Sequence, residues 1–182
     1  MPATLPHLSS WQRCVLWAGV STAAVLMHAD LPRRVAQPPN LAGATLRGAR
    51  LESALLAGAR LARARLQLAD LCGADLQGAE LCEATLVEAD CKGARHRKAD
   101  LQGADLRCAV LTQADLREAN LANARLEGAV LEFTDLRGAD LAGATYNQDT
   151  TWPAGFEPGA AGAVRVVVPK DSDLAGRRNQ LP

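Results

Sequence analysis

Leucine recurs at every fifth position over the central part of this chain. From Leu41 to Tyr146 the pattern gives 22 positions without an insertion, and 19 of them are Leu. The residue two places before each of these positions is Ala in 20 of the 22 cases. Such self-similarity predicts one short structural unit that is repeated many times, rather than a set of distinct elements.

A spacing of five fits neither an α-helix nor a straight strand. An α-helix turns by about 100° per residue, so successive Leu residues would be about 140° apart around its surface. In a straight strand they would alternate between the two faces of the sheet. The Ala and Leu of one unit lie two residues apart and can point to the same side. A chain that bends after each unit therefore directs every Ala–Leu pair towards one axis.

Glycine is frequent where the chain is expected to bend. Gly occupies the second position after the repeated residue in ten units, where its tolerance of unusual backbone angles favours a corner. Units such as 69–73 (Ala-Asp-Leu-Cys-Gly) and 139–143 (Ala-Asp-Leu-Ala-Gly) resemble those of the pentapeptide repeat family. The resemblance covers residues 39–148 and implies an all-β fold, a right-handed quadrilateral parallel β-helix with four units per coil. It also implies that each Leu and its preceding Ala point inward.

The sequence on either side of the repeats has a different composition. We expect residues 1–38 to form an apolar segment and a Pro-rich linker, and residues 39–148 to form the β-helix. Residues 149–168 are predicted to form a C-terminal cap, in which Val164 to Val168 can add one short strand. Three of the six aromatic residues of the chain lie near this end of the repeats: Tyr146, Trp152 and Phe156. We expect them to cover the last leucine layer. Residues 169–182 are polar and are expected to be disordered.

The N-terminal segment allows two interpretations. Residues 14–29 carry no charged side chain; they are too short for a usual membrane-spanning helix but suit the core of a signal peptide. This supports an exported protein, or one anchored in a membrane through residues 14–29. The alternative is a cap over the open strand edges of the first coil. The five cysteines form no C-x-x-C pair, which indicates reduced thiols and favours a cytoplasmic location.

Outward columns of residues follow from the implied geometry, because four units per coil place residues twenty apart above one another. One column contains Arg97, Arg117 and Arg137, and the column two residues earlier contains Asp115 and Asp135. These five residues are the candidate interaction face, with an acidic protein as the partner. The alternative is a solvated surface that carries weak ion pairs.

Cys91 and His96 are the two consecutive repeat positions that do not hold Leu. One interpretation makes them a redox or metal pair inside the coil, but two ligands without further His, Cys or acid make a poor site. The favoured interpretation is structural: Cys91 acts as a small hydrophobic residue, and His96 is a neutral, hydrogen-bonded core histidine. We therefore expect no metal and no cofactor.

Composition narrows the classes of function. The 20 basic and 20 acidic residues leave no net charge, so the excess of positive charge typical of nucleic-acid binding is missing. Aromatic residues make up only 3% of the chain and offer few surfaces on which single-stranded bases could stack. The motifs of hydrolases, P-loop proteins and dinucleotide-binding enzymes are not found. We therefore predict a protein that is not an enzyme and has no small-molecule substrate.

The leading functional prediction is a non-catalytic β-helical scaffold with flat faces for protein–protein interaction, or with a structural role. The identity of the protein partner is unknown. The family resemblance implies one alternative, a DNA mimic that modulates DNA gyrase or topoisomerase. Such mimicry needs a sustained acidic surface, whereas residues 41–146 sum to minus two charges. The other alternative is the exported or membrane-anchored envelope protein.

Overall fold

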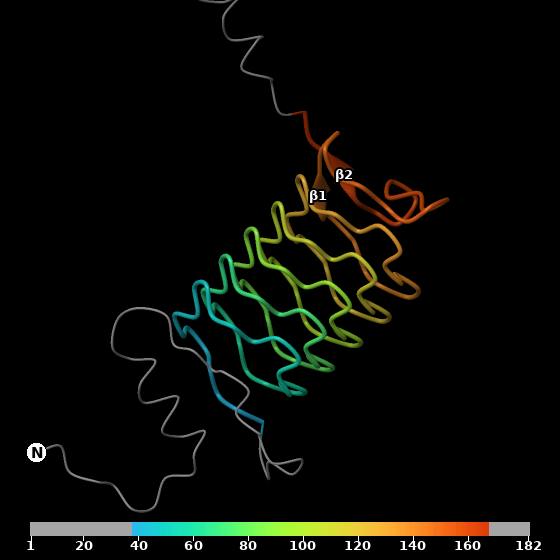
Figure 1. The fold of residues 1–182 in the computed structure, drawn as a ribbon. Helices are drawn as coiled ribbons and strands as arrows, with labels where there is room; N and C mark the ends of the chain where they lie inside the picture. The colour runs from blue at the N-terminus through green and yellow to red at the C-terminus, as the bar shows by residue number, and fades with distance from the viewer. Residues whose placement is uncertain (1–37, 168–182) are drawn as a thin grey trace, which may run out of the picture.

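The structure, a computed structural model, describes residues 38–167 (Figure 1). The chain winds as a right-handed quadrilateral β-helix, in which four five-residue units complete one coil. Isolated parallel bridges join residues twenty positions apart, for example Asn40 to Arg60 and Asp75 to Arg95. The quadrilateral β-helix that the resemblance implies is therefore confirmed. The expectations for residues 1–37 and 168–182 lie outside the described part of the chain.

The same set of backbone hydrogen bonds recurs from unit to unit. The N–H of Leu41 donates to the carbonyl of Arg60 in the next coil at 2.7 Å, and that of Gly43 donates to Ala62 at 2.8 Å. Within the unit, the N–H of Ala44 donates to the carbonyl of Leu41 at 3.0 Å and closes a tight turn. Each wall is thus a stack of very short parallel strands, separated from the next wall by a turn.

The second residue after each repeat position has a positive φ at every corner from Gly43 to Gly143. Ten of these residues are glycines and eleven are not. A positive φ at this place is the mark of a type II turn, which favours Gly. Gln113 and Phe133 adopt the same conformation, at 62° and 60°, although a left-handed conformation costs such residues about 1 kcal/mol or more. The place in the coil, more than the residue type, therefore sets the backbone conformation.

Asp and Asn immediately before the repeat position have a local structural role. In each such unit the side-chain oxygen accepts a hydrogen bond from the backbone N–H two residues later, as from Cys72 to Asp70 at 3.1 Å. That N–H points outward at the turn, where the ladder between coils does not reach it. All ten Asp and Asn residues at this position make the bond: Asn40, Asp70, Asp75, Asp90, Asp100, Asp105, Asp115, Asn120, Asp135 and Asp140.

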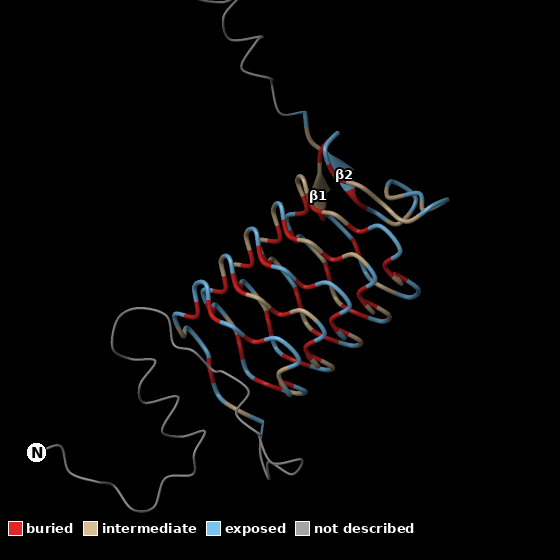
Figure 2. Ribbon diagram, viewed as in Figure 1, coloured by how far each residue is buried: buried red, intermediate tan, exposed pale blue. Residues whose placement is uncertain are grey.

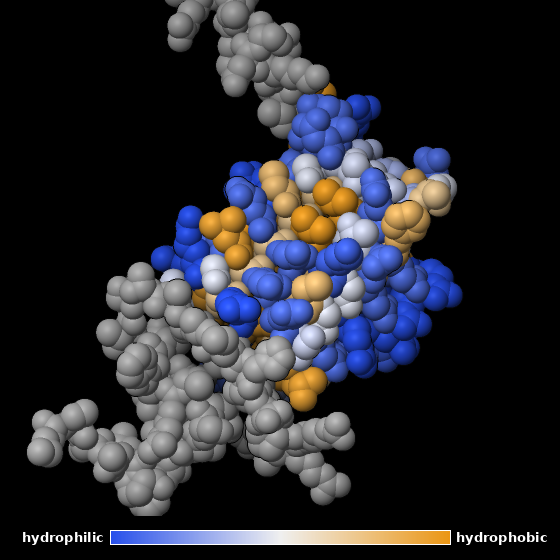
Figure 3. Space-filling view, viewed as in Figure 1, coloured by the Kyte–Doolittle hydropathy of each residue, from blue (hydrophilic) through white to orange (hydrophobic). Residues whose placement is uncertain are grey.

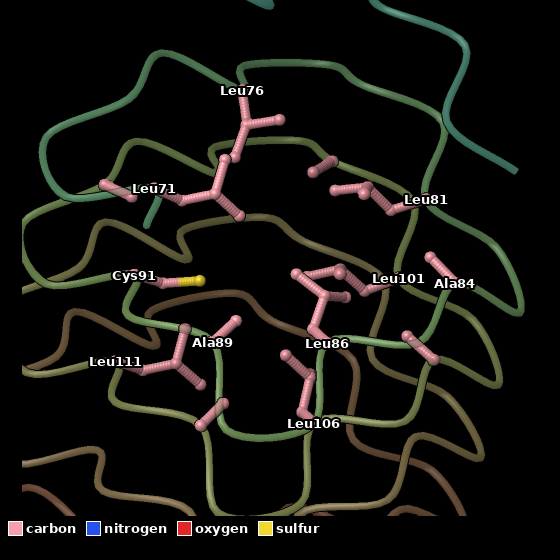
Figure 4. Packing of buried hydrophobic residues seen from close by; sticks show 14 of the residues in the cluster. Leu71, Leu76, Leu81, Ala84, Leu86, Ala89, Cys91, Leu101, Leu106 and Leu111 are labelled. Carbon is pink, nitrogen blue, oxygen red and sulfur yellow. The ribbon is translucent and has the colours of Figure 1, made fainter. Parts of the chain in front are cut away.

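The inward residues fill the lumen with aliphatic side chains. The repeat positions from Leu41 to Leu141 are all buried, as are nearly all the alanines that precede them (Figure 2). Figure 4 shows these side chains stacked in layers, with Cys91 on the same wall as Leu71 and Leu111. Full burial of one leucine contributes about 1.5–3 kcal/mol relative to an exposed one. On the face seen in Figure 3, hydrophobic side chains occur only in small groups among hydrophilic ones.

The regular register ends after Tyr146. Val130 pairs with Thr151, twenty-one residues later rather than twenty. β1 (Thr145–Tyr146) then pairs in parallel with β2 (Val164–Arg165), which forms the last strand of the described chain. β2 lies within the segment expected to add a short strand, but it is only two residues long.

Candidate protein-docking face

One wall of the β-helix carries a row of guanidinium groups on its outer side. Arg97, Arg117 and Arg137 occupy the same outward position in three successive coils, because Arg95, Asp115 and Asp135 on their strands are joined by bridges. We call the outward residues of these three strands the arginine face: Arg95, Arg97, Lys98, Asp115, Arg117, Glu118, Asp135 and Arg137. The structure thus brings all five of the predicted interaction residues together.

Arg117 and Arg137 are each held by the aspartate of their own strand. Nη2 of Arg117 lies 2.6 Å from Oδ2 of Asp115, and its Nε donates to Oδ1 of the same carboxylate at 2.8 Å. Arg137 forms the same bidentate ion pair with Asp135, with an Nη2–Oδ2 distance of 2.6 Å. Nε of Arg117 also lies 3.6 Å from Oδ2 of Asp135 in the next coil. The four groups therefore form one chain of alternating charge along the β-helix axis.

Arg97 has a different partner, because the residue two places before it is Arg95 rather than Asp. Its Nε and Nη2 donate to Oε1 of Glu118 in the next coil, at 3.1 and 2.7 Å. Lys98 lies 3.5 Å from the other oxygen of Glu118. Arg95 in turn pairs with Asp75 of the preceding coil at 3.7 Å. Glu118 and Lys98 were not among the residues predicted from the sequence, although the twenty-residue register places both on this wall.

The ion pairs shift the pKa values of the groups that form them. Hydrogen bonds from Arg137, above all, lower the pKa of Asp135 to about 2. Hydrogen bonding to Arg117 lowers the pKa of Asp115, and that to Arg97 lowers the pKa of Glu118. The pKa of Arg117 is raised, chiefly by its hydrogen bonds to Asp115. The four ion-paired groups of Asp115, Arg117, Asp135 and Arg137 are therefore all charged at neutral pH.

The three aromatic side chains expected in the C-terminal cap lie together. The rings of Tyr146 and Trp152 meet edge to face, with centroids 5.5 Å apart. Those of Trp152 and Phe156 are stacked, with centroids 5.3 Å apart. All three are partly buried and pack against the hydrophobic core. Among residues 38–167, the structure contains no helix long and apolar enough to cross a membrane.

Comparison with known proteins identifies the family. The family model for pentapeptide repeats matches eight copies, over residues 40–71, 64–95, 97–132 and 114–145. These matches extend over more than half of the chain. The chain belongs to the pentapeptide repeat family. A search of curated protein sequences finds no significant match.

Several solved pentapeptide repeat proteins resemble this member. One from the Arabidopsis thaliana thylakoid lumen is 32% identical, with 56% of this chain and 68% of that chain covered and a TM-score of 0.41. Another, from Nostoc PCC 7120, is 34% identical, with 67% and 84% covered and a TM-score of 0.34. QnrB1, a plasmid-mediated fluoroquinolone resistance protein, is 23% identical, with 64% and 59% covered and a TM-score of 0.52. At that identity, the likeness to QnrB1 shows the fold alone.

Cys91 and His96 are the two fully buried repeat positions of this pentapeptide repeat protein that do not hold leucine. Both are fully buried, and neither ring nitrogen of His96 has a hydrogen-bond partner in the described structure. Burial lowers the pKa of His96 to about 4 and raises that of Cys91 to about 12, so both are neutral. The predicted hydrogen bond of His96 is not formed by its ring nitrogens within the described residues, and the backbone of Ala94 opposes the effect of burial on its pKa only in part. Residues 38–167 contain no group of three or more side chains suited to a metal.

Proposed function

We propose that this pentapeptide repeat protein is a non-catalytic scaffold that binds a protein partner through the arginine face. The observation that carries the proposal is the alignment of three guanidinium groups in successive coils, each fixed by a carboxylate at 2.6–2.7 Å. Groups that are already held in place lose little conformational freedom when a partner binds. A flat, rigid wall also suits a macromolecular surface better than a small ligand.

Isolated ion pairs on a protein surface contribute little to stability, about 0–1 kcal/mol each. Such a small contribution does not by itself account for three guanidinium groups in register on one wall, whereas electrostatic recognition does. The same alternation of charge argues against the DNA-mimic alternative, because acidic residues on this wall are interrupted by Arg95, Arg97 and Arg117. The four cysteines within residues 38–167 are free thiols, and on this basis we propose a reducing, cytoplasmic location.

Site-specific cross-linking tests the docking proposal. A photo-reactive residue in place of Gln77, which precedes the arginines in the same column, is expected to capture a defined partner in cells. The same residue in place of Ala122, on another wall, is the matched control. The partner identified from position 77 is then purified and titrated against the wild type and the R97A/R117A/R137A variant. Equal affinities would contradict docking through the arginine face.

A control for charge keeps this result specific. The R50A/R60A/R65A variant removes three arginines from the other three walls and changes the net charge by the same amount. It is expected to bind the purified partner like the wild type. If both triple variants lose binding equally, net charge rather than the arginine face governs the association, and the proposal fails.

A further inference from the structure

Each guanidinium of the arginine face has one edge that the ion pairs leave free. Arg97, Arg117 and Arg137 all use Nε and Nη2 for their carboxylate partners. Their Nη1 groups make no hydrogen bond within the described residues. The three side chains are 42%, 38% and 78% exposed. The wall therefore presents three fixed donors to solvent, each able to bind a further acceptor.

The spacing of the three arginines along the axis selects among the acidic structures that could bind them. Strands in successive coils lie about 4.8 Å apart, so the backbone positions of the three arginines extend over about 10 Å. In an α-helix, acids at positions i, i+3 or i+4, and i+7 also extend over about 10 Å, at a rise of 1.5 Å per residue. Alternate residues of an extended strand would need about 13 Å for three acids. The α-helix is the better match.

Charges beside the arginine column fix the orientation of such a helix. On one side of the column, two residues earlier in the strands, lie Arg95, Asp115 and Asp135; on the other side lie Lys98 and Glu118, which pair with each other. The first side is net acidic, whereas the second carries no net charge. A helix with acids over the arginines therefore gains further from a basic residue above the two aspartates, and this difference favours one direction of the helix.

We propose that the partner element recognised by the arginine face is an acidic α-helix that lies along the axis of the β-helix. Its carboxylates, at positions i, i+3 or i+4, and i+7, bind Nη1 of Arg97, Arg117 and Arg137. This inference rests on the docking function proposed above, to which it adds the chemistry and geometry of the partner.

Synthetic peptides test the geometry directly. The probe is an alanine- and glutamine-based helical peptide of about 20 residues, long enough to be helical in water, with glutamates at i, i+4 and i+7. A second peptide has the same composition with its glutamates at i, i+5 and i+10, which distributes them around the helix. Fluorescence anisotropy with the full chain at low salt is expected to show at least about tenfold tighter binding of the first peptide. Circular dichroism verifies that both peptides are helical.

The protein variants complete the test. R97A/R117A/R137A is expected to lose the preference for the first peptide, whereas R50A/R60A/R65A is expected to keep it. Thermal unfolding of both variants verifies that the β-helix is intact. Equal binding of the two peptides by the wild type would overturn the proposal that the arginine face recognises an acidic α-helix. If the cross-linked partner still requires the three arginines, the docking proposal stands without it. If neither the partner nor the peptides require them, both proposals fail.

Discussion

Leu106 and Arg107 are neighbours in the chain but lie on opposite sides of one wall. Leu106 is fully buried in the lumen, whereas the side chain of Arg107 is 40% exposed and pairs with Asp105 on the outer surface at 2.7 Å. The inward position accepts Leu almost without exception, while the next position along the chain holds residues as different as Ala, Glu, Gln and Arg. The lumen therefore carries the stability of the β-helix, and the outer surface is free to carry recognition.

Replacing Leu106 and Arg107 in turn is the strongest test of this difference between the lumen and the outer surface. Leu106→Ala leaves a cavity among packed aliphatic side chains and is expected to lower the free energy of unfolding by about 2–5 kcal/mol. Arg107→Ala removes an exposed ion pair and is expected to change it by no more than about 1 kcal/mol. Urea denaturation of both variants measures the difference. Similar losses for the two would show that the outer ion pairs contribute to stability as much as the lumen does.

His96 is an ionisable residue in a lumen of mostly aliphatic side chains. Its contribution to the free energy of unfolding depends on pH. The pKa is about 4 in the folded chain and about 6.5 in the unfolded chain. Between pH 6.5 and pH 4 the imidazole of His96 is protonated in the unfolded chain but neutral in the folded chain. The free energy of unfolding therefore falls as the pH falls through this range. The loss amounts to about 3 kcal/mol. His96→Leu is expected to remove this part of the pH dependence, measured by urea denaturation at pH 7 and pH 4.5.

A second lumen variant makes the histidine experiment specific. Cys91→Ala changes the packing of the adjacent unit but leaves the imidazole in place, so its stability is expected to fall with pH as in the wild type. His96→Leu is also expected to be the more stable protein at pH 7, because it removes two buried nitrogens without partners. An unchanged pH profile in His96→Leu would show that His96 is hydrated in solution.

The period of five predicted a chain that bends after each unit, because few other arrangements bury every leucine. The resemblance to pentapeptide repeats implied the quadrilateral β-helix with four units per coil. The arginine face was located from that implied geometry, since four units per coil give a register of twenty residues. The pairing of Arg97 with Glu118 was not predictable in the same way, because it depends on the reach of side chains between coils. The missing partners of the His96 ring nitrogens were not predictable either. The buried side chains of the described lumen are nearly all aliphatic and offer few hydrogen-bonding groups.

Asp140 tests whether an outward residue can matter to the fold through the backbone. Its Oδ1 accepts a hydrogen bond from the N–H of Ala142 at 2.9 Å. Asp140→Ala is expected to lower the free energy of unfolding by about 1 kcal/mol. Asp140→Asn is expected to be neutral, because Asn40 and Asn120 make the same bond at their own positions. Equal losses in the two variants, measured by thermal and urea denaturation, would assign the effect to the charge instead.

The corners between walls belong neither to the lumen nor to the outer surface. Substitutions there are expected to change the free energy of unfolding least. Gln113 has a φ of 62°, a conformation that costs a residue with a side chain about 1–2 kcal/mol. Glycine avoids this cost but loses about 0.5–1 kcal/mol through the greater freedom of the unfolded chain. Gln113→Gly is therefore expected to stabilise the protein by about 0.5 kcal/mol. Thr112→Gly, at the neighbouring position without a positive φ, is expected to destabilise it by a similar amount. If urea denaturation shows both variants to be destabilised, the corner conformation is not strained.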